Sequence, residues 1–228
     1  MTVTLITGAN KGLGYETARR LTERGHRLYV GARNAERGEA AASAIGARFV
    51  QLDVTDDVSV EAALGRIAGD EGHLDVLVNN AGISAVGDVT GPVALSVFDT
   101  NVVGIVRVTQ AALPLLELSQ NPVVVNVSSA LGSFWAVTNP ERRQFHFPSI
   151  VYGSSKAAVS MLTVQYAKTY PGIKFNAVEP GFTATDLTPF SGAGQPVEKG
   201  AEVIIRMATI GADGPTGSFQ EGEDELAW

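Results

Sequence analysis

The fold is decided by a glycine-rich stretch near the N-terminus, Thr7-Gly8-Ala9-Asn10-Lys11-Gly12-Leu13-Gly14. It lies between the apolar, β-branched run Val3–Thr7 and a segment of helical periodicity, Leu13–Arg24. Glycines at such a place allow a tight turn, a close approach of the backbone to a pyrophosphate and close packing of a helix on a strand. The helix then offers free N–H groups and a positive dipole end to phosphates. The stretch therefore predicts a dinucleotide site after the first strand.

The spacing of the glycines narrows the kind of site. It is G-x3-G-x-G, which differs from the commoner G-x-G-x-x-G fingerprint. A P-loop is excluded because Lys11 precedes Gly12 and no Gly-Lys-Ser/Thr follows. Taken alone, the stretch is also compatible with an ordinary glycine turn.

Along the rest of the chain, short β-branched runs alternate with longer segments of helical periodicity. This alternation predicts an α/β Rossmann fold, a doubly wound parallel sheet of about seven strands with helices on both faces, in which residues 1–228 form a single domain. The expected strands are Val3–Thr7, Arg27–Gly31, Phe49–Leu52, Val76–Asn79, Val123–Val127, Lys174–Val178 and a short one near Ser218–Gln220. The expected helices are Leu13–Arg24, Ala35–Ile45, Asp57–Ala68, Val93–Leu118, Tyr152–Thr169 and about Val197–Ile210. Ligands of such sheets bind beyond the carboxyl ends of the strands.

The composition excludes several classes of function. The 228 residues include no cysteine, which excludes disulfides, thiolate metal sites and a cysteine nucleophile. The net charge of −7 argues against binding of a nucleic acid polymer, and the three histidines lack metal-ligand spacing, so no metal is expected. No uninterrupted apolar run has the length of a membrane span, so no membrane contact and a cytoplasmic location are expected. The acidic end Glu221–Glu225 is expected to be a solvated tail.

The end of the second expected strand indicates which cofactor the site takes. A site for NAD places an Asp or Glu there to hold the ribose 2′-hydroxyl. This strand instead runs into Arg33, and Arg37 follows it. A guanidinium binds a 2′-phosphate through two hydrogen bonds, and Lys11 adds a positive charge. NADPH/NADP is therefore expected and NAD is less favoured, while the interpretation of both arginines as solvated surface charges stays open.

Further motifs follow in order along the chain: Asp53-Val54, Asn79-Asn80-Ala81-Gly82, Asn101, Ser128-Ser129, Tyr152-x3-Lys156 and Pro180-Gly181. With the glycine stretch, they resemble the full motif set of the short-chain dehydrogenase/reductase family from Thr4 to about Thr185. The resemblance implies hydride transfer between a nicotinamide cofactor and a carbonyl or alcohol. Within the family, Arg33-x3-Arg37, Phe49–Asp53 and Gly214–Gly217 resemble the NADPH-dependent carbonyl reductases.

The catalytic residues expected from the chemistry and the resemblance are Asn101, Ser129, Tyr152 and Lys156. Tyr152 would give the carbonyl oxygen its proton, although a free phenol has a pKa of about 10. Lys156 lies four residues on, on the same helix face, and its ammonium, together with the positive charge of the oxidised nicotinamide, is expected to lower that pKa. The resemblance implies that Ser129 polarises the substrate oxygen, that Lys156 also holds the nicotinamide ribose, and that Asn101 supports a water relay. A buried, satisfied amide is the alternative for Asn101.

The resemblance also assigns the cofactor contacts. Asp53 would meet the adenine amine beside Val54, and Asn80-Ala81-Gly82 would line the adenosine ribose. In the segment 180–185, the backbone at Phe182 and the Thr183 and Thr185 hydroxyls would meet the carboxamide and the phosphates. The complete expected set is Gly8, Asn10, Lys11, Gly12, Leu13, Arg33, Arg37, Asp53, Val54, Asn80, Ala81, Gly82, Tyr152, Lys156, Pro180, Gly181, Phe182, Thr183 and Thr185.

One segment departs from the family pattern, and a second segment belongs to it. An extra loop at about 134–148 separates Ser129 from Tyr152 by more than the family's usual spacing, and its aromatic residues suggest a pocket wall, with a tolerated surface loop as the alternative. In similar carbonyl reductases an insertion here covers the helix face used for dimers, so a monomer is favoured over a homodimer. The region of about 185–210 is expected to close over substrate.

The sequence therefore predicts NADPH-dependent reduction of an aldehyde or ketone to an alcohol. An NAD-linked alcohol or sugar dehydrogenase is the alternative within the enzymes, and Arg33 in place of an acid counts against it. A non-catalytic nucleotide-binding sensor is the alternative from another class. The presence of the whole Ser/Tyr/Lys set counts against that hypothesis.

Overall fold

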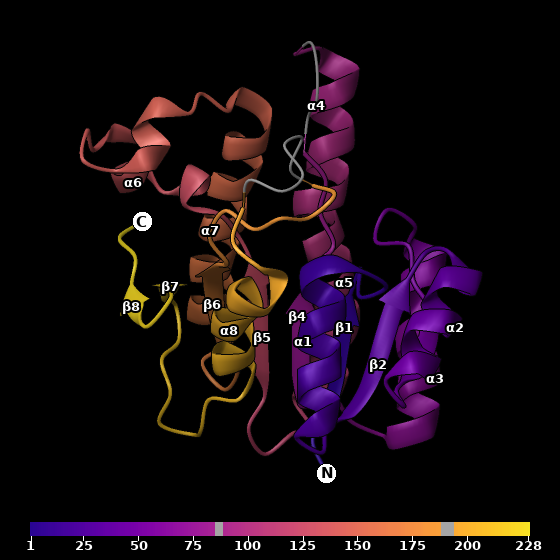
Figure 1. Ribbon diagram of the computed structural model, residues 1–228. Coiled ribbons are helices and arrows are strands. Elements are labelled where there is room, and N and C mark those ends of the chain that lie inside the picture. The colour runs from indigo at the N-terminus through magenta and orange to yellow at the C-terminus, as the bar shows by residue number, and fades with distance from the viewer. Residues whose placement is uncertain (85–88, 188–193) are drawn as a thin grey trace.

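The computed structural model describes residues 1–84, 89–187 and 194–228, which form one twisted sheet between two layers of helices (Figure 1). The strand order is β3-β2-β1-β4-β5-β6-β7-β8, with every pairing parallel except the last. The strands are β1 (Val3–Thr7), β2 (Arg27–Ala32), β3 (Arg48–Gln51), β4 (Val76–Asn79), β5 (Val123–Val127), β6 (Lys174–Glu179), β7 (Phe219–Glu221) and β8 (Asp224–Glu225). The α/β fold with a doubly wound sheet is thus confirmed.

The helices connect these strands and cover both faces of the sheet. They are α1 (Gly12–Glu23), α2 (Ala35–Ala44), α3 (Asp57–Glu71), α4 (Gly91–Phe98), α5 (Gly104–Leu116), α6 (Phe134–Thr138), α7 (Ile150–Thr169) and α8 (Val197–Ala208). Short 3-10 turns, η2 (Ala130–Gly132) and η3 (Arg143–His146), flank α6. Asp56 caps α3 by accepting hydrogen bonds from two backbone N–H groups of its first turn, which agrees with the helix start expected from the sequence.

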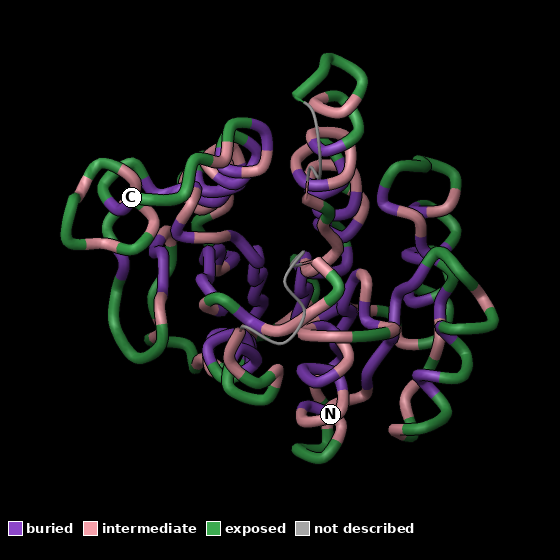
Figure 2. The backbone as a smooth tube through the Cα atoms, turned by 45° about the horizontal axis from the view of Figure 1, so that its top comes forward, coloured by how far each residue is buried: buried purple, intermediate pink, exposed green. Residues whose placement is uncertain are grey.

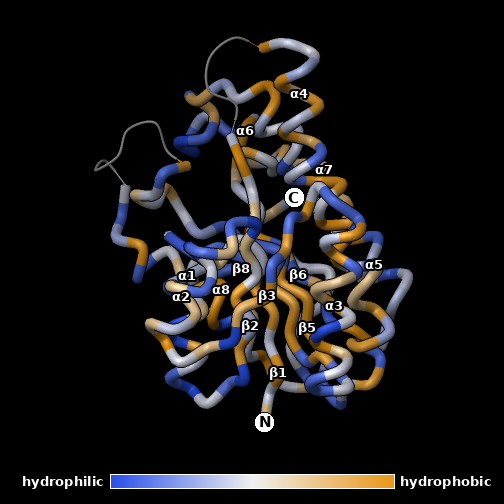
Figure 3. Tube along the Cα trace, turned by 90° about the vertical axis from the view of Figure 1, so that its right-hand side faces the viewer, coloured by the Kyte–Doolittle hydropathy of each residue, from blue (hydrophilic) through white to orange (hydrophobic). Residues whose placement is uncertain are grey.

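Two separate hydrophobic cores lie on the two faces of the sheet. One packs α1, α2 and α8 against the strands, and the other packs α3, α5 and α7. The central strands β1, β4 and β5 are buried along their whole length, as strands covered on both faces should be. Figure 2 shows the buried residues running through the middle of the molecule, and Figure 3 shows the apolar residues gathered along the same strands.

The end of the chain differs from the sequence expectation. Residues 222–225 of the acidic segment are exposed, as expected, but the segment is not a tail, because Gly222, with a φ of +57°, turns the chain into a β7–β8 hairpin. This hairpin makes the sheet eight-stranded instead of about seven. Beyond it, Leu226 is buried against Phe219, and the Trp228 ring lies 5.3 Å from that of Phe219. The apolar residues at the end of the chain therefore anchor the acidic turn.

The long helix expected over 93–118 is interrupted. One turn, Asp99–Val103, is a π-helix with Asn101 at its centre, and it joins α4 to α5. By length and hydropathy, Gly91–Leu116 could cross a membrane, a test that core helices of soluble proteins also pass. Val108, Ala112 and Leu116 of this run are fully buried in the core beneath the sheet. A π-turn inside an α-helix often marks a functional position.

The order of the strands reverses between β1 and β4, so the loops that follow these strands diverge at that point. Open α/β sheets bind their ligands at such a switch point, beyond the carboxyl ends of the strands. In Figure 1, α4 and the segment that holds α6 both extend past these strand ends. A ligand site is therefore expected at the loops after β1, β4, β5 and β6.

Candidate active site

The structure brings Ser129, Tyr152 and Lys156 together beyond the end of β5. Ser129 precedes the turn η2, which packs on α7, the helix that carries Tyr152 and Lys156. The Ser129 hydroxyl interacts with the Tyr152 phenol, and the Lys156 ammonium lies 5.6 Å from the centre of the Tyr152 ring. These three side chains form the candidate catalytic cluster.

Lys156 is held inside the protein by the end of β5. It is 4 % exposed, and its Nζ donates a hydrogen bond of 2.8 Å to the carbonyl of Val127. Burial lowers the pKa of Lys156 to about 8, and the nearby charge of Glu179 partly opposes this shift. The amine is thus fixed in position, and at neutral pH it is mainly in the ammonium form.

Burial, and then the charge of Glu179, raise the pKa of Tyr152 above its usual value. The expected lowering of this pKa by the Lys156 ammonium together with the positive charge of the oxidised nicotinamide stays a prediction. The interaction with Ser129 lowers the pKa of Tyr152, but by less than burial and Glu179 raise it. Tyr152 therefore holds its proton in this structure.

Asn101 is the polar centre of the π-helical turn. Its Oδ1 accepts a hydrogen bond of 2.8 Å from the N–H of Ile83, and its Nδ2 donates to the carbonyl of Ile83 and to Ser155 Oγ. The fully buried amide thus ties the loop after β4 to α7. These contacts match the alternative of a buried, satisfied amide, and the water relay stays a prediction. Ser128 lies deeper, and its hydroxyl donates to the carbonyl of Lys156.

The glycine stretch forms the turn between β1 and α1. Gly8 has a φ of +64°, and a Cβ there would lie 3.0 Å from the Cα of Ala81. A Cβ on Gly14 would lie 2.5 Å from the Asn80 amide and 2.8 Å from the carbonyl of Gly8. Only glycine permits this approach of the first loop to the loop after β4. Lys11, the N-cap residue of α1, makes no side-chain capping bond, so the N-terminal turn stays available to an anion.

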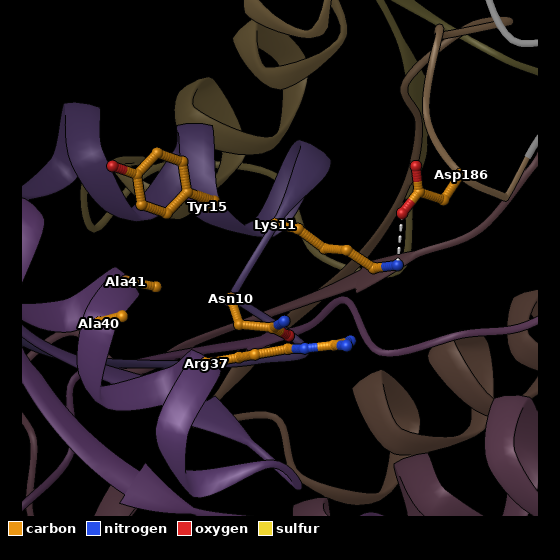
Figure 4. A pocket seen from close by; sticks show the side chains of 7 residues that line it. All are labelled: Asn10, Lys11, Tyr15, Arg37, Ala40, Ala41 and Asp186. Atoms are coloured by element: carbon orange, nitrogen blue, oxygen red, sulfur yellow. Dashed lines mark hydrogen bonds and ion pairs between the residues drawn. The ribbon is translucent and has the colours of Figure 1, made fainter.

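A surface cavity of about 400 Å³ opens beside this helix end (Figure 4). It is lined by Asn10, Lys11, Tyr15, Arg37, Ala40, Ala41 and Asp186. Arg37 reaches it from the start of α2, whereas Arg33 is exposed and does not line it. The Nζ of Lys11 lies 2.6 Å from a carboxylate oxygen of Asp186 in an exposed ion pair. Two cations and a helix N-terminus at one cavity fit the phosphates of a dinucleotide.

The residues expected to hold the adenosine lie along the same edge. Oδ1 of Asp53 accepts hydrogen bonds from the backbone and hydroxyl of Thr55. Burial acts to raise the pKa of Asp53, but these bonds outweigh it and hold the pKa below its usual value. Asn80 donates to the carbonyl of Thr7 at 2.8 Å, so its side chain supports the loop itself. A Cβ on Gly82 would lie 3.7 Å from the Nζ of Lys156, which places this loop beside the catalytic cluster.

The segment after β6 lies over the glycine stretch. The hydroxyl of Thr183 donates to the carbonyls of Pro180 and Gly181, and Thr183 is 4 % exposed. A Cβ on Gly12 would lie 3.5 Å from the Thr185 methyl group, so Thr185 lies beside the helix end. Within the expected substrate region of about 185–210, residues 188–193 lie outside the described residues.

Sequence reasoning missed Glu179 at the end of β6. Its carboxylate accepts hydrogen bonds from the backbone N–H groups of Ala130 and Gly181, and it also interacts with the Ser129 side chain. One signal was present, because a carboxyl directly after the apolar run Ala177-Val178 and before Pro180 is unusual for a buried strand. The extra loop contains α6 and η3, with Phe134, Trp135, Phe145 and Phe147 exposed. The Trp135 ring lies 5.4 Å from the Arg142 guanidinium, and the role of these aromatic residues as a pocket wall stays a prediction.

Comparison with known proteins gives consistent results. A family described as short chain dehydrogenase matches residues 2–195. The (−)-isopiperitenone reductase of Mentha piperita is 33% identical over 98% of this chain and 97% of its own length. That alignment spans 308 positions, so the relative has many residues without a counterpart in this chain.

Solved structures of similar fold include two reductases. Salutaridine reductase from Papaver somniferum is 27% identical, with a TM-score of 0.84 over 96% of this chain and 99% of that one. An NADPH-bound carbonyl reductase from chicken fatty liver has a TM-score of 0.87 over all of both chains. Because the two sequences are only 24% identical, this comparison shows a similar fold and nothing more.

Proposed function

The chain belongs to the short-chain dehydrogenase family and is an oxidoreductase that acts on CH–OH or C=O groups, and from this premise we propose that it reduces an aldehyde or ketone with NADPH. The observation that carries the proposal is the meeting of Ser129, Tyr152 and Lys156 beyond the carboxyl end of the sheet. When bound, the nicotinamide cofactor supplies the hydride. The side chains of the protein supply the proton and the orientation.

Each of the three side chains has a separate role in this proposal. Tyr152 donates its proton to the carbonyl oxygen as that oxygen gains negative charge. The Ser129 hydroxyl donates a hydrogen bond to the same oxygen and so polarises the carbonyl. Lys156, fixed by Val127, holds the ribose of the cofactor. Asn101 keeps the loop after β4 in contact with α7.

The choice of NADPH rests on the positive charges around the cavity beside α1. Arg37 and Lys11 line it together with Asn10 and with Asp186, whose carboxylate pairs with Lys11. The 2′-phosphate of NADPH carries negative charge that NADH lacks, so these cations favour NADPH. Arg33, exposed at the end of β2, adds positive charge nearby and acts on Asp53. A monomeric state and a cytoplasmic location stay predictions.

Replacement of Arg37 by Ala tests the cofactor preference. We expect the KM for NADPH to rise about 10- to 100-fold, because a hydrogen bond between charged groups contributes about 1.5–3 kcal/mol. The KM for NADH should change little. Steady-state kinetics with both cofactors measure the two KM values. Arg24→Ala is the matched control, because Arg24 lies at the C-terminal end of α1, whereas the cavity lies beside the N-terminal end. An equal loss with both cofactors would contradict the assignment of Arg37 to the 2′-phosphate.

The proposed function is tested by incubating the purified protein with a panel of aldehydes and ketones and each reduced cofactor. We expect NADPH to be oxidised with at least one carbonyl, and faster than NADH. Binding of NADPH without turnover of any carbonyl would instead support the non-catalytic sensor. Faster turnover of alcohols with NAD would support the alcohol or sugar dehydrogenase.

A further inference from the structure

Glu179 is a buried carboxyl group inside the candidate active site, and the roles proposed above make no use of it. It is 7 % exposed at the end of β6. Its Oε1 accepts a hydrogen bond of 3.0 Å from the N–H of Gly181, and its Oε2 accepts one from the N–H of Ala130. The carboxyl group therefore joins the turn after β5, which starts at Ser129, to the turn after β6.

The Ser129 side chain is a neighbour of both Glu179 and Tyr152. It interacts with both side chains, and it lowers the pKa of each. A serine hydroxyl has one proton to donate and two lone pairs that accept. A carboxylate at Glu179 attracts that single proton, whereas a neutral carboxyl group can donate its own proton to Ser129 Oγ. The charge of Glu179 thus decides in which direction the Ser129 proton points.

We propose that Glu179 is a positioning residue for Ser129 in the reductase, an inference that rests on the proposed function. In its neutral form Glu179 leaves the Ser129 proton free to reach the substrate oxygen. In its ionised form it draws that proton to itself. No proton passes from Glu179 to the substrate, so the residue acts only through Ser129.

The groups that face Glu179 set the pH at which it changes form. Tyr152 and Lys156 face it from α7, Ser129 from the turn after β5, and Glu221 from β7. Burial, and then the like charge of Glu221, raise the pKa of Glu179 to about 7, against the hydrogen bonds from Ala130, Ser129 and Gly181. Both forms of Glu179 are therefore populated near neutral pH.

Glu221 offers a second way to change the pKa of Glu179. Both of its carboxylate oxygens lie 2.7 Å from the Arg142 guanidinium, which comes from the extra loop. Removing the charge of Glu221 would leave Glu179 with one anion fewer and Arg142 with an uncompensated positive charge. Both changes favour the ionised form of Glu179 and so move its pKa downward.

The experiment is the pH profile of kcat/KM for carbonyl reduction in the wild type, Glu179→Gln and Glu221→Gln. In the wild type we expect kcat/KM to fall about three- to tenfold as pH rises through the pKa of Glu179, the effect of one hydrogen bond to the substrate oxygen. This step should be absent in Glu179→Gln and should move to lower pH in Glu221→Gln. Glu225→Gln, an exposed carboxyl on β8, should leave it in place.

A second measurement does not depend on turnover. The folded state binds the Glu179 proton more tightly than the unfolded chain does, so this group's contribution to stability is present below the unfolded pKa and is lost as pH rises to about 7. The Tm of the wild type should therefore fall relative to that of Glu179→Gln between about pH 5 and pH 8, so that the Tm deficit of the variant narrows as pH rises. The Gln amide loses one of the two backbone hydrogen bonds, which lowers its Tm at every pH without creating this slope.

The outcomes separate the two proposals. A wild type that reduces no carbonyl overturns the proposed function and the role of Glu179 with it. An active wild type whose pH step persists in Glu179→Gln, or stays in place in Glu221→Gln, overturns only the role of Glu179. A Glu179→Gln protein that does not fold leaves the shift in Glu221→Gln as the deciding result.

Discussion

Replacing Tyr152 with Phe should lower kcat for carbonyl reduction by about a hundred- to ten-thousand-fold, the range that a positioned general acid contributes. The substitution removes the only phenol proton at the catalytic cluster and leaves the ring in place over Lys156. The dissociation constant for NADPH should stay unchanged, because the ring still fills the same space. Single-turnover kinetics and a fluorescence titration with NADPH measure the two quantities.

Tyr166→Phe is the matched control for this substitution. Tyr166 is a second buried tyrosine on α7, and its hydroxyl accepts a hydrogen bond of 3.0 Å from Gln110, away from the catalytic cluster. We expect this variant to keep its turnover. If Tyr152→Phe keeps more than a small fraction of the wild-type rate, another group supplies the proton and the assignment of Tyr152 is wrong.

The main elements of the fold could be predicted because they depend on local patterns. Strands buried on both faces are almost continuously apolar, and β1, β4 and β5 end at the residues that the sequence indicated. The short strand β7 was expected near Ser218–Gln220, but β8 and the hairpin could not be predicted in the same way, because they depend on the packing of Leu226 and Trp228 against Phe219. The π-turn has the same kind of cause, since Asn101 is bonded to Ile83 and Ser155, which lie far from it in the sequence.

The candidate site could be predicted as a set of residues but not as a set of charges. Motif order brought Ser129, Tyr152 and Lys156 to one place, because the carboxyl ends of parallel strands meet at one edge of the sheet. The pKa of a buried group depends instead on burial and on neighbours from other strands. Burial raises the pKa of Tyr152, and Glu179, which comes from β6, adds to this shift. The ion pair of Lys11 with Asp186 likewise joins distant parts of the chain.

A substitution at Gly132 should weaken both the stability and the geometry of the site. A Cβ there would lie 2.4 Å from the backbone carbon of Lys156 and 2.5 Å from the backbone nitrogen of Ala157. Backbone atoms in the middle of α7 cannot move aside as a flexible side chain can. We expect Gly132→Ala to lower the free energy of unfolding by about 1–3 kcal/mol or more, and Tm by roughly 3–10 °C.

The same substitution should also lower kcat, because η2 can relieve the overlap only by moving away from α7. Ser129 begins this turn, and Tyr152 and Lys156 lie on the helix, so the separation between the serine and its partners would increase. Gly65→Ala is the control, since Gly65 lies inside α3 with no atom near the added Cβ, and alanine there should raise stability by about 0.5–1 kcal/mol. Thermal unfolding together with kcat for the three proteins tests this. An unchanged Tm and kcat in Gly132→Ala would mean that the contact of η2 with α7 does not hold Ser129 in place.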